Sequence, residues 1–410
     1  MKEKRAYAKL LVETGVNIQP GQTLVLSAPV ECAPFARLCA AAAYEKGCRE
    51  VVTVWRDDFM TRQKYLHASD DIFDVVRPWE ADRVNTLAAE GAAALSITGS
   101  DPELLTGVAP DRIRRADVAY GTAVKKAREL QTRNAFQWCV ASAPTYGWAR
   151  KVFPELYEAD AVDALWNAIL AAARVSGDSD ESLAAWKAHS DELHARMEIL
   201  NAYDFRTLHY ENALGTDLTL DLPEGHFWAG GDETAANGVC FSANIPTEEV
   251  FTLPKRDTAE GVVFASLPLV LNGHIVSDFG FRFHAGKITE ILTNSETDRK
   301  LLQDAVSVDE GASYLGEVAL VPYDSPISAS GILFYNTLFD ENAACHLAFG
   351  AAYPCIRGAE ELPEEKLEAL GLNTSMTHED FMIGTADLSI TGITRDGRRI
   401  PVFVNGNFAF

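Results

Sequence analysis

The amino-acid sequence predicts an α/β N-terminal domain with a doubly wound, mostly parallel sheet, followed by an α+β C-terminal domain rich in antiparallel strands. The chain has 410 residues, and domains of about 100–200 residues make two the natural number. Strand and helix patterns alternate in the first half, which is typical of βαβ units. Near residues 195–205 the hydrophobic period changes from that of helices to that of alternating strands. We therefore expect domains at 1–200 and 201–410.

The clearest βαβ unit lies close to the N-terminus. The turn Gln19-Pro20-Gly21 precedes an apolar strand at 23–26, and a helix over 33–46 ends at Gly47, a residue suited to the position after a helix. The strand 50–54 follows, and the helical crossover makes the two strands parallel. The remaining elements expected here are helices at 5–13, 84–90 and 111–130, two more between 154 and 200 (the second at 179–200), and strands at 92–98 and 135–140.

The C-terminal half contains short alternating patterns separated by glycines, which indicate antiparallel strands. Two short helices are expected among them, at 296–305 and 341–347, and the second would carry His346. The expected strands include 218–220, 239–241, 262–264 and 279–283.

The charge balance restricts the class of partner. Asp and Glu number 59 against 36 Lys and Arg, which gives a net charge of −23. Phosphate backbones and anionic membrane surfaces attract cationic proteins, so nucleic-acid and membrane binding are disfavoured. Cationic partners, including metal ions and amines, are favoured instead.

The cysteines and the N-terminal residues indicate a compartment. The seven cysteines have spacings that fit neither a CxxC metal knuckle nor a disulfide framework, so we expect buried thiols. The first residues lack the pattern of a secretory signal, and no segment approaches the roughly 18 consecutive apolar residues of a membrane span. These features favour the reducing cytoplasm.

Candidate metal ligands are concentrated in the C-terminal half. His378 and Asp380 lie two apart on an extended segment, so both side chains can face one borderline-hard divalent cation such as Zn²⁺, Co²⁺ or Mn²⁺. Glu248 and Glu249 stand directly before an apolar strand, and Glu317 lies within one. A carboxylate in so apolar a stretch must be solvated, paired or metal-bound, because an unpaired buried charge is costly. Ordinary solvated surface or sheet-edge positions remain the alternative for each.

Other catalytic templates are absent from the sequence. The segment starting at His378 begins like HExxH, but Met382 stands where the second histidine is required. There is no nucleophile elbow and no phosphate-binding Walker loop. Cys345 adjoins His346, but helical neighbours point about 100° apart, so we expect a buried structural cysteine rather than a thiol–imidazole pair.

At these same segments the sequence resembles the aminopeptidase T / aminopeptidase S (PepS) family of thermostable-type metallo-aminopeptidases. The resemblance extends along most of the chain and is densest after residue 220. Its motifs are Asn-Ile-Pro-Thr-Glu-Glu-Val-Phe-Thr (244–252), Asp-Glu-Gly-Ala-Ser-Tyr-Leu-Gly-Glu-Val-Ala-Leu-Val-Pro (309–322), Asn-Thr-Leu-Phe-Asp-Glu-Asn-Ala-Ala-Cys-His-Leu-Ala (336–348) and His-Glu-Asp-Phe-Met-Ile-Gly (378–384).

The resemblance implies a hydrolase that releases N-terminal amino acids from peptides by a water activated by two divalent ions per chain (Zn, Co, Mn or Mg). It implies a homodimer, peptide substrates with a free N-terminus, and an N-terminal domain that restricts access. Of the neighbours Glu248 and Glu249, only one can face the metals, and the resemblance favours Glu249. The implied metal ligands are Glu249, Glu317, His346, His378 and Asp380, and the implied catalytic residues are Tyr353 and Glu317; the general base is not assigned.

Two other functions are compatible with such a site. A different two-metal hydrolase, an amidase or a phosphoesterase, could use the same ions. The net charge of −23 and the lack of an Arg-rich phosphate clamp near the motifs favour the peptidase. A non-catalytic binding protein of the same fold is disfavoured because every ligand position is filled.

Overall fold

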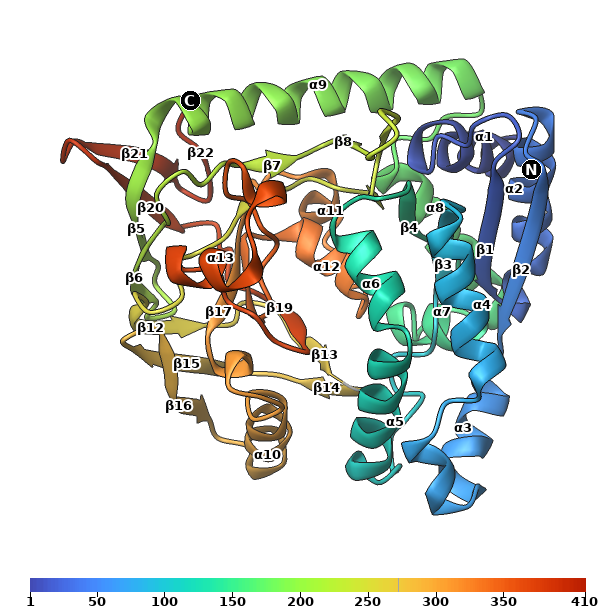
Figure 1. Ribbon diagram of the computed structural model, residues 1–410, viewed down its shortest axis with the longest axis horizontal. Helices are drawn as coiled ribbons and strands as arrows, with labels where there is room; N and C mark the ends of the chain where they lie inside the picture. The colour runs from blue at the N-terminus through green and yellow to red at the C-terminus, as the bar shows by residue number, and fades with distance from the viewer. Residues whose placement is uncertain (272) are drawn as a thin grey trace. The chain divides into compact units, whose positions relative to one another are not determined.

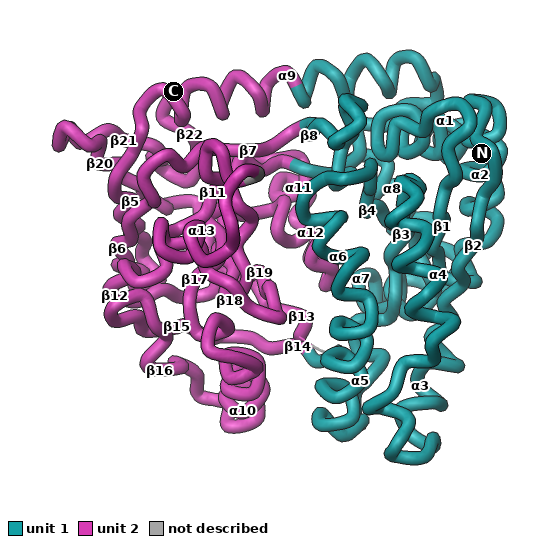
Figure 2. Tube along the Cα trace, viewed as in Figure 1, with its two compact units in different colours: residues 1–190, 232–247, 272–274 teal, residues 191–231, 248–271, 275–410 magenta. Residues whose placement is uncertain are grey.

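The computed structural model describes residues 1–271 and 273–410. The chain forms two compact units (Figure 2). The first contains residues 1–190 and 232–247 with Gly273 and His274, and the second contains residues 191–231, 248–271 and 275–410. Along the chain, the first boundary between the two units lies between residues 190 and 191, within the long helix α9 (Ser179–Tyr203).

The first unit is built on a five-stranded parallel sheet surrounded by helices (Figure 1), which confirms the predicted α/β class. Its strand order is β10-β4-β3-β1-β2. The strands are β1 (Thr23–Pro29), β2 (Glu50–Arg56), β3 (Ala93–Thr98), β4 (Trp138–Ser142) and β10 (Asn244–Ile245). A hairpin of β8 (Glu233–Thr234) and β9 (Cys240–Phe241) also belongs to this unit.

The helices of the first unit begin where local signals favour them. Asp57 and Thr145 accept hydrogen bonds from backbone N–H groups in the first turns of α3 and α7. Tyr7 of α1 stacks on Phe35 of α2, and Phe35 meets the edge of Trp166 of α8, so these three helices share one aromatic core. The helices are α1 (Lys2–Leu10, continued by a π-helical turn at Leu11–Gly15), α2 (Ala33–Glu45), α3 (Asp58–His67), α4 (Pro78–Ala89), α5 (Pro110–Ala123), α6 (Lys125–Thr132), α7 (Tyr146–Val152) and α8 (Glu158–Ala172).

The second unit contains two antiparallel sheets, which confirms the predicted change of strand type. The five-stranded sheet has the order β19-β18-β17-β11-β7, and the eight-stranded sheet has the order β16-β15-β12-β6-β5-β20-β21-β22. The first comprises β7 (Ala229–Gly230), β11 (Val250–Thr252), β17 (Leu315–Leu320), β18 (His346–Gly350) and β19 (His378–Met382). The second comprises β5 (Phe205–Glu211), β6 (Asp217–Asp221), β12 (Glu260–Phe264), β15 (Phe279–His284), β16 (Lys287–Thr293), β20 (Ser389–Thr394), β21 (Arg399–Val404) and β22 (Asn407–Phe408). Other elements are β13 (Leu269–Leu271), β14 (His274–Val276), α10 (Glu296–Ala305), α11 (Pro326–Ala329), α12 (Thr337–Asp340) and α13 (Glu364–Leu370).

One face of the five-stranded sheet is buried in the apolar core that it shares with the eight-stranded sheet. Phe281 of β15 makes edge-to-face ring contacts with Phe349 of β18 and Phe381 of β19, at centroid distances of 5.8 and 5.2 Å. Because strand side chains alternate between faces, the residues beside these aromatics point away from the core. The opposite face of the sheet is therefore free for polar chemistry.

The helix predicted at 341–347 is wrong in its second half. Residues 341–343 form a short 3₁₀ turn, and β18 begins at His346. The apolar residues of this short segment fit the period of either a helix or a strand. As a strand, the segment buries Cys345, Leu347 and Phe349 in the core. Its backbone hydrogen-bonding groups pair with those of β17 and β19. The helix predicted at 296–305 is confirmed as α10.

The cysteines are free, as predicted, and six of the seven are buried. Cys345 lies in the core, where its thiol donates to the Val321 carbonyl oxygen (3.2 Å). Cys240 is the exception, because Phe241 takes the buried side of the short strand β9 and leaves Cys240 exposed. Across the described residues, we find no helix whose length and apolar character would carry it through a membrane.

Candidate metal centre

The five side chains predicted as ligands come together on the polar face of the five-stranded sheet, and we call them the ligand cluster. β17 carries Glu317, β18 carries His346, β19 carries His378 and Asp380, and Glu249 directly precedes β11. They form two overlapping groups whose potential ligand atoms lie within 4.8 Å of one another. The first group is Glu249, Glu317 and His346, and the second group is Glu317, His378 and Asp380.

The strand register explains this convergence. Ala348 of β18 lies opposite both Glu317 and Asp380, so a small side chain separates the two carboxylates across the sheet. The ladder between β17 and β18 shifts by one residue between Leu315 and Glu317. This bulge changes the alternation, so that Leu315 is in the core while Glu317 faces the cluster.

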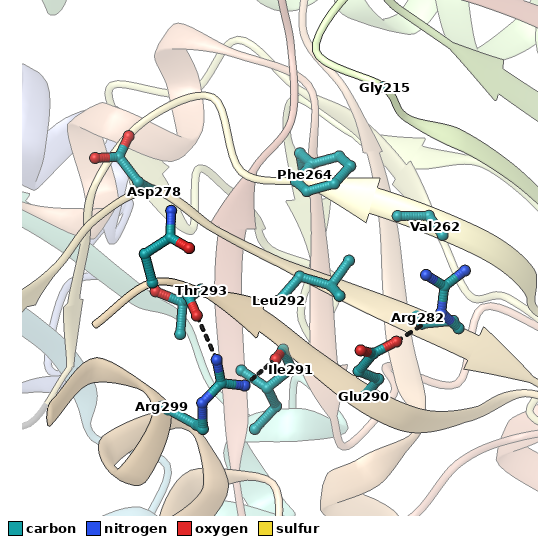
Figure 3. Close-up of a pocket in the computed structure, with 11 residues that line it drawn as sticks. Gly215, Val262, Phe264, Asp278, Arg282, Glu290, Ile291, Leu292, Thr293 and Arg299 are labelled. Carbon is teal, nitrogen blue, oxygen red and sulfur yellow. Dashed lines mark hydrogen bonds and ion pairs between the residues drawn. The ribbon is translucent and has the colours of Figure 1, made fainter. Parts of the chain in front are cut away.

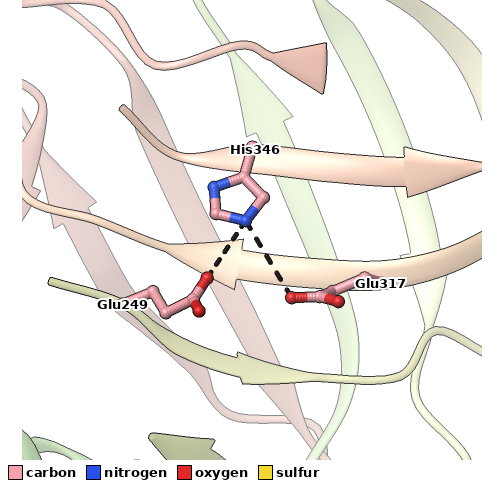
Figure 4. A group of neighbouring side chains, drawn as sticks. All are labelled: Glu249, Glu317 and His346. Atoms are coloured by element: carbon pink, nitrogen blue, oxygen red, sulfur yellow. Dashed lines mark ion pairs between the residues drawn. The ribbon is translucent and has the colours of Figure 1, made fainter. Parts of the chain in front are cut away.

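In the first group, His346 Nε2 lies 3.1 Å from Glu249 Oε2 and 3.9 Å from Glu317 Oε1 (Figure 4). All three side chains are buried, and His346 is only 1% exposed. Two carboxylates thus face one imidazole nitrogen in a site largely closed to water.

In the second group, His378 Nε2 lies 3.2 Å from Glu317 Oε2 and 3.3 Å from Asp380 Oδ1. The two oxygens of Glu317 therefore face different histidines. That arrangement suits a carboxylate shared between two cation positions.

Backbone carbonyls orient both imidazoles. The Nδ1 of His378 lies 2.7 Å from the Ala351 carbonyl oxygen, and the Nδ1 of His346 lies 3.2 Å from that of Ala344. An Nδ1–H that donates to a carbonyl leaves the Nε2 lone pair for a cation, the usual arrangement of metal-binding histidines. Both Nε2 atoms point at the carboxylates of the cluster.

The neighbouring residues Glu248 and Glu249 differ in their position relative to the ligand cluster. Glu249 lies in the first group, whereas Glu248 belongs to neither group. Both are buried, and the backbone N–H of Glu248 donates to Asn342 Oδ1 at 2.6 Å. The structure thus brings Glu249 to the cluster, as the resemblance favours.

The electrostatics show a surplus of negative charge in a buried space. Burial alone would lower the pKa of His346, but its hydrogen bond to Glu249 and the charges of nearby carboxylates raise that pKa to about 10. The pKa of Glu317 is raised by burial and by neighbouring carboxylates, against the opposing effect of His378. Burial opposes ionisation of Asp380 too, yet the two histidines hold its pKa below the ordinary value.

This set of donors fits divalent cations. Carboxylate oxygens and imidazole nitrogens bind Zn²⁺, Co²⁺ and Mn²⁺ well, and buried carboxylates need a compensating positive charge. The donors of each group could therefore hold a divalent cation.

Glu341 is a functional candidate that the sequence reasoning missed. Its carboxyl is buried, and its pKa is raised well above the ordinary value by burial and then by the negative charges of Asp380 and Glu249. Asn342 Nδ2 donates to its Oε1 at 3.3 Å. Polar residues flank it on both sides, Asp340 and Asn342, so an apolar surrounding does not single it out as it does Glu317. The available signal was its position within the motif 336–348, five residues before His346.

Tyr353 borders the second group. Its ring meets the His378 ring edge-on at a centroid distance of 5.8 Å and the Phe251 ring at 5.9 Å. The side chain is 36% exposed, so it lies at the rim of the site rather than beneath it.

A pocket of about 570 Å³ on the eight-stranded sheet is separate from the cluster (Figure 3). None of the five candidate ligands lines it. Of the charged side chains that line it, Arg282 pairs with Glu290 and Arg299 donates to backbone carbonyls of β16.

Comparisons with known proteins show which family the chain resembles. The family model described as thermophilic metalloprotease (M29) matches residues 2–408. Aminopeptidase AmpS of Bacillus subtilis (strain 168) is 46% identical over 405 residues, covering 98% of each chain. Aminopeptidase 2 of Geobacillus stearothermophilus is 44% identical over 410 residues, covering 100% of this chain and 98% of the relative.

A solved structure gives the same result. Wild-type AmpT from Thermus thermophilus matches with a TM-score of 0.91 at 38% identity, covering 100% of this chain and 99% of that one. Together these matches make the protein a peptide-bond hydrolase that acts as an aminopeptidase and uses a divalent metal. The chain therefore belongs to the M29 family of metalloproteases.

Proposed function

We propose that this aminopeptidase uses two divalent ions, one held by each group of the ligand cluster, to hydrolyse the first peptide bond of its substrates. The observation that supports two ions is the position of Glu317, whose two oxygens face His346 and His378 separately. Glu249 and His346 would hold one ion, His378 and Asp380 the other, and Glu317 both.

The bound ions would supply an acidified water and polarise the substrate carbonyl, which is what neighbouring metal pairs contribute in hydrolases. The residues of this chain would supply the rest. Glu341 would act as the general base that takes the proton of the attacking water and passes it to the departing amine. The Tyr353 hydroxyl would donate a hydrogen bond to the developing oxyanion, an interaction that usually contributes strongly to such reactions.

The substrate's free α-amine would bind within the same negative site. Three carboxylates of the ligand cluster and Glu341 surround this buried space, and a protonated or metal-bound amine suits that charge. Blocked peptides lack the group and should be poor substrates.

The test uses protein stripped with a chelator and reloaded with Co²⁺ or Zn²⁺. We expect two ions per chain and hydrolysis of aminoacyl p-nitroanilides, but not of their N-acetylated forms or of p-nitrophenyl phosphate. Equal cleavage of the acetylated compounds would indicate an amidase, and cleavage of the phosphate ester would indicate a phosphoesterase. A single ion at full turnover would contradict the two-metal mechanism.

We also propose a homodimer in which the first unit restricts access to the site. The large hydrophobic side chains that are strongly exposed in the first unit include Phe59 (68%), Met60 (62%), Val75 (61%) and Trp79 (63%). Exposed aromatic side chains of this kind are enriched at protein interfaces. The cytoplasmic location expected from the cysteines stays a prediction.

A further inference from the structure

We infer that Asn342 is a positioning residue for the ligand cluster, because its amide joins the backbone at Glu248 to the carboxylate of Glu341. The inference rests on the proposed function of the cluster. Asn342 lies in the 3₁₀ turn between α12 and β18, and its side chain is completely buried.

The amide of Asn342 is fully used. Its Oδ1 accepts from the backbone N–H of Glu248 at 2.6 Å. Its Nδ2 donates to the Leu338 carbonyl oxygen at 2.8 Å and to Glu341 Oε1 at 3.3 Å. One buried side chain thus connects two chain segments that both supply carboxylates to the site.

The contact with Glu248 determines which of two adjacent carboxylates faces the cluster. Neighbouring residues of an extended segment point to opposite sides. With the N–H of Glu248 directed at Asn342, the next side chain, Glu249, reaches His346 at 3.1 Å. Turning this peptide would move Glu249 away from His346.

The contact with Glu341 holds the second carboxylate. Glu341 lies among negative charges, and an amide N–H is a donor without charge that keeps one of its oxygens in place. Leucine has the same branched shape and number of side-chain heavy atoms as asparagine, with bulkier methyl groups, and offers neither contact. Aspartate offers only the acceptor, and its charge would oppose that of Glu341.

The backbone of Asn342 is held as well. Ser325 Oγ donates to the Asn342 carbonyl oxygen at 3.1 Å, and Ser325 also caps α11. The turn therefore stays fixed while the side chain makes its contacts.

Asn201 provides a matched control in the same unit. Its Oδ1 accepts from the Trp228 N–H at 2.9 Å, and its Nδ2 donates to the Trp228 carbonyl oxygen at 3.2 Å. Like Asn342, Asn201 makes hydrogen bonds through both amide atoms with the backbone of a residue distant in sequence. Its partner Trp228 is not part of the ligand cluster. Loss of this amide should affect stability alone.

Four metal-free proteins are compared: the wild type, Asn342→Leu, Asn342→Asp and Asn201→Leu. Each is titrated with Zn²⁺ by calorimetry and with Co²⁺ by visible absorption. Thermal unfolding and turnover are measured on the same proteins. Asn342→Leu should weaken binding of at least one ion by about 10–100-fold and change the Co²⁺ spectrum. Asn342→Asp keeps the acceptor for Glu248, so it should bind metal almost normally while kcat falls and KM changes little. Asn201→Leu should unfold at a lower temperature with unchanged metal binding.

The inference is overturned if Asn342→Leu binds both ions with wild-type affinity and spectrum, whatever its stability. If Asn342→Leu does not fold, the Asn342→Asp variant provides the test. A wild-type kcat in Asn342→Asp then overturns the inference. Failure of the proposed two-metal function gives a different result from failure of this inference, because the wild-type protein itself would then bind fewer than two ions.

Discussion

Glu317 connects the two groups of the ligand cluster, with one oxygen toward each histidine. Replacing Glu317 by Gln keeps the size of the side chain but removes the charge that the two proposed cation positions would share. We expect the variant to lose at least one of two bound ions and nearly all turnover, as measured by metal analysis after dialysis and by p-nitroanilide hydrolysis. The control is Glu290→Gln in β16 of the eight-stranded sheet. This variant should keep the wild-type metal content and turnover.

Glu341 offers a second test at the scale of single residues. If it is the base, Glu341→Gln should retain two ions while kcat falls by roughly 10²–10⁴, the usual contribution of proton transfer by a side chain. Metal content and steady-state kinetics measured on the same preparation would check this. Loss of an ion together with activity would identify Glu341 as a ligand instead.

Tyr353→Phe removes one hydroxyl and leaves the ring contact with His378 in place. If the hydroxyl stabilises the oxyanion, kcat should fall by roughly 10²–10³ with unchanged metal content. The exposed Tyr323 is a matched control, and Tyr323→Phe should behave as wild type. Normal turnover of Tyr353→Phe would exclude the hydroxyl from the reaction.

Metal binding should depend on pH with a defined sign. In the metal-free protein the pKa of His346 is about 10, so this imidazole is protonated at neutral pH. A ligand must be neutral, so binding releases this proton and affinity rises as pH increases toward about 10. Calorimetry in buffers of different ionisation enthalpy should show protons released at pH 7, and acidification should strip the ions. Proton uptake on binding would contradict the assignment.

Part of the candidate ligand set was accessible from the residues alone, where a polar residue stands in an unusually apolar or patterned segment. Glu317 within its strand and His378-x-Asp380 are such cases. His346 and the choice of Glu249 over Glu248, in contrast, came from the family resemblance. The proposed role of Asn342 was not accessible, because it depends on a hydrogen bond with the backbone N–H of Glu248, far away in the sequence.

At the scale of elements, long periodic segments were predictable and short ones were not. The βαβ unit from β1 to β2 shows strong patterns over many residues and was found. β10 has two residues and no period of its own, yet it extends the parallel sheet beside β4. The start of β18 at His346 was missed because tertiary pairing, rather than local pattern, selects a strand there.

The bulge in β17 provides a prediction at this scale. A Cβ on Gly316 would lie 2.4 Å from the carbonyl oxygens of Gly350 and Ala351, so β17 and the end of β18 would have to separate. Gly316→Ala should lower the free energy of unfolding by about 1–3 kcal/mol and weaken metal binding through Glu317. Gly177→Ala is the control, because a Cβ there meets nothing within 4 Å. Chemical denaturation and metal titration of both variants would show whether the bulge positions Glu317.

At the scale of the whole molecule, the proposed dimer predicts a mass of about twice 44.8 kDa in sedimentation equilibrium. Trp79 is an exposed aromatic residue of the first unit, and Trp79→Asp should weaken association if this surface is the interface. The variant should retain hydrolysis of aminoacyl p-nitroanilides, since Trp79 is not part of the ligand cluster. A wild type that is monomeric at micromolar concentration would disprove the dimer.

The distribution of the proposed ligands along the chain has a consequence for biosynthesis. His378 and Asp380 lie on β19, after β11, β17 and β18 have already been made. A ribosome-bound chain that ends before residue 378 lacks two of the three side chains of the second group. If two ions bind as proposed, complete loading must therefore follow synthesis of β19.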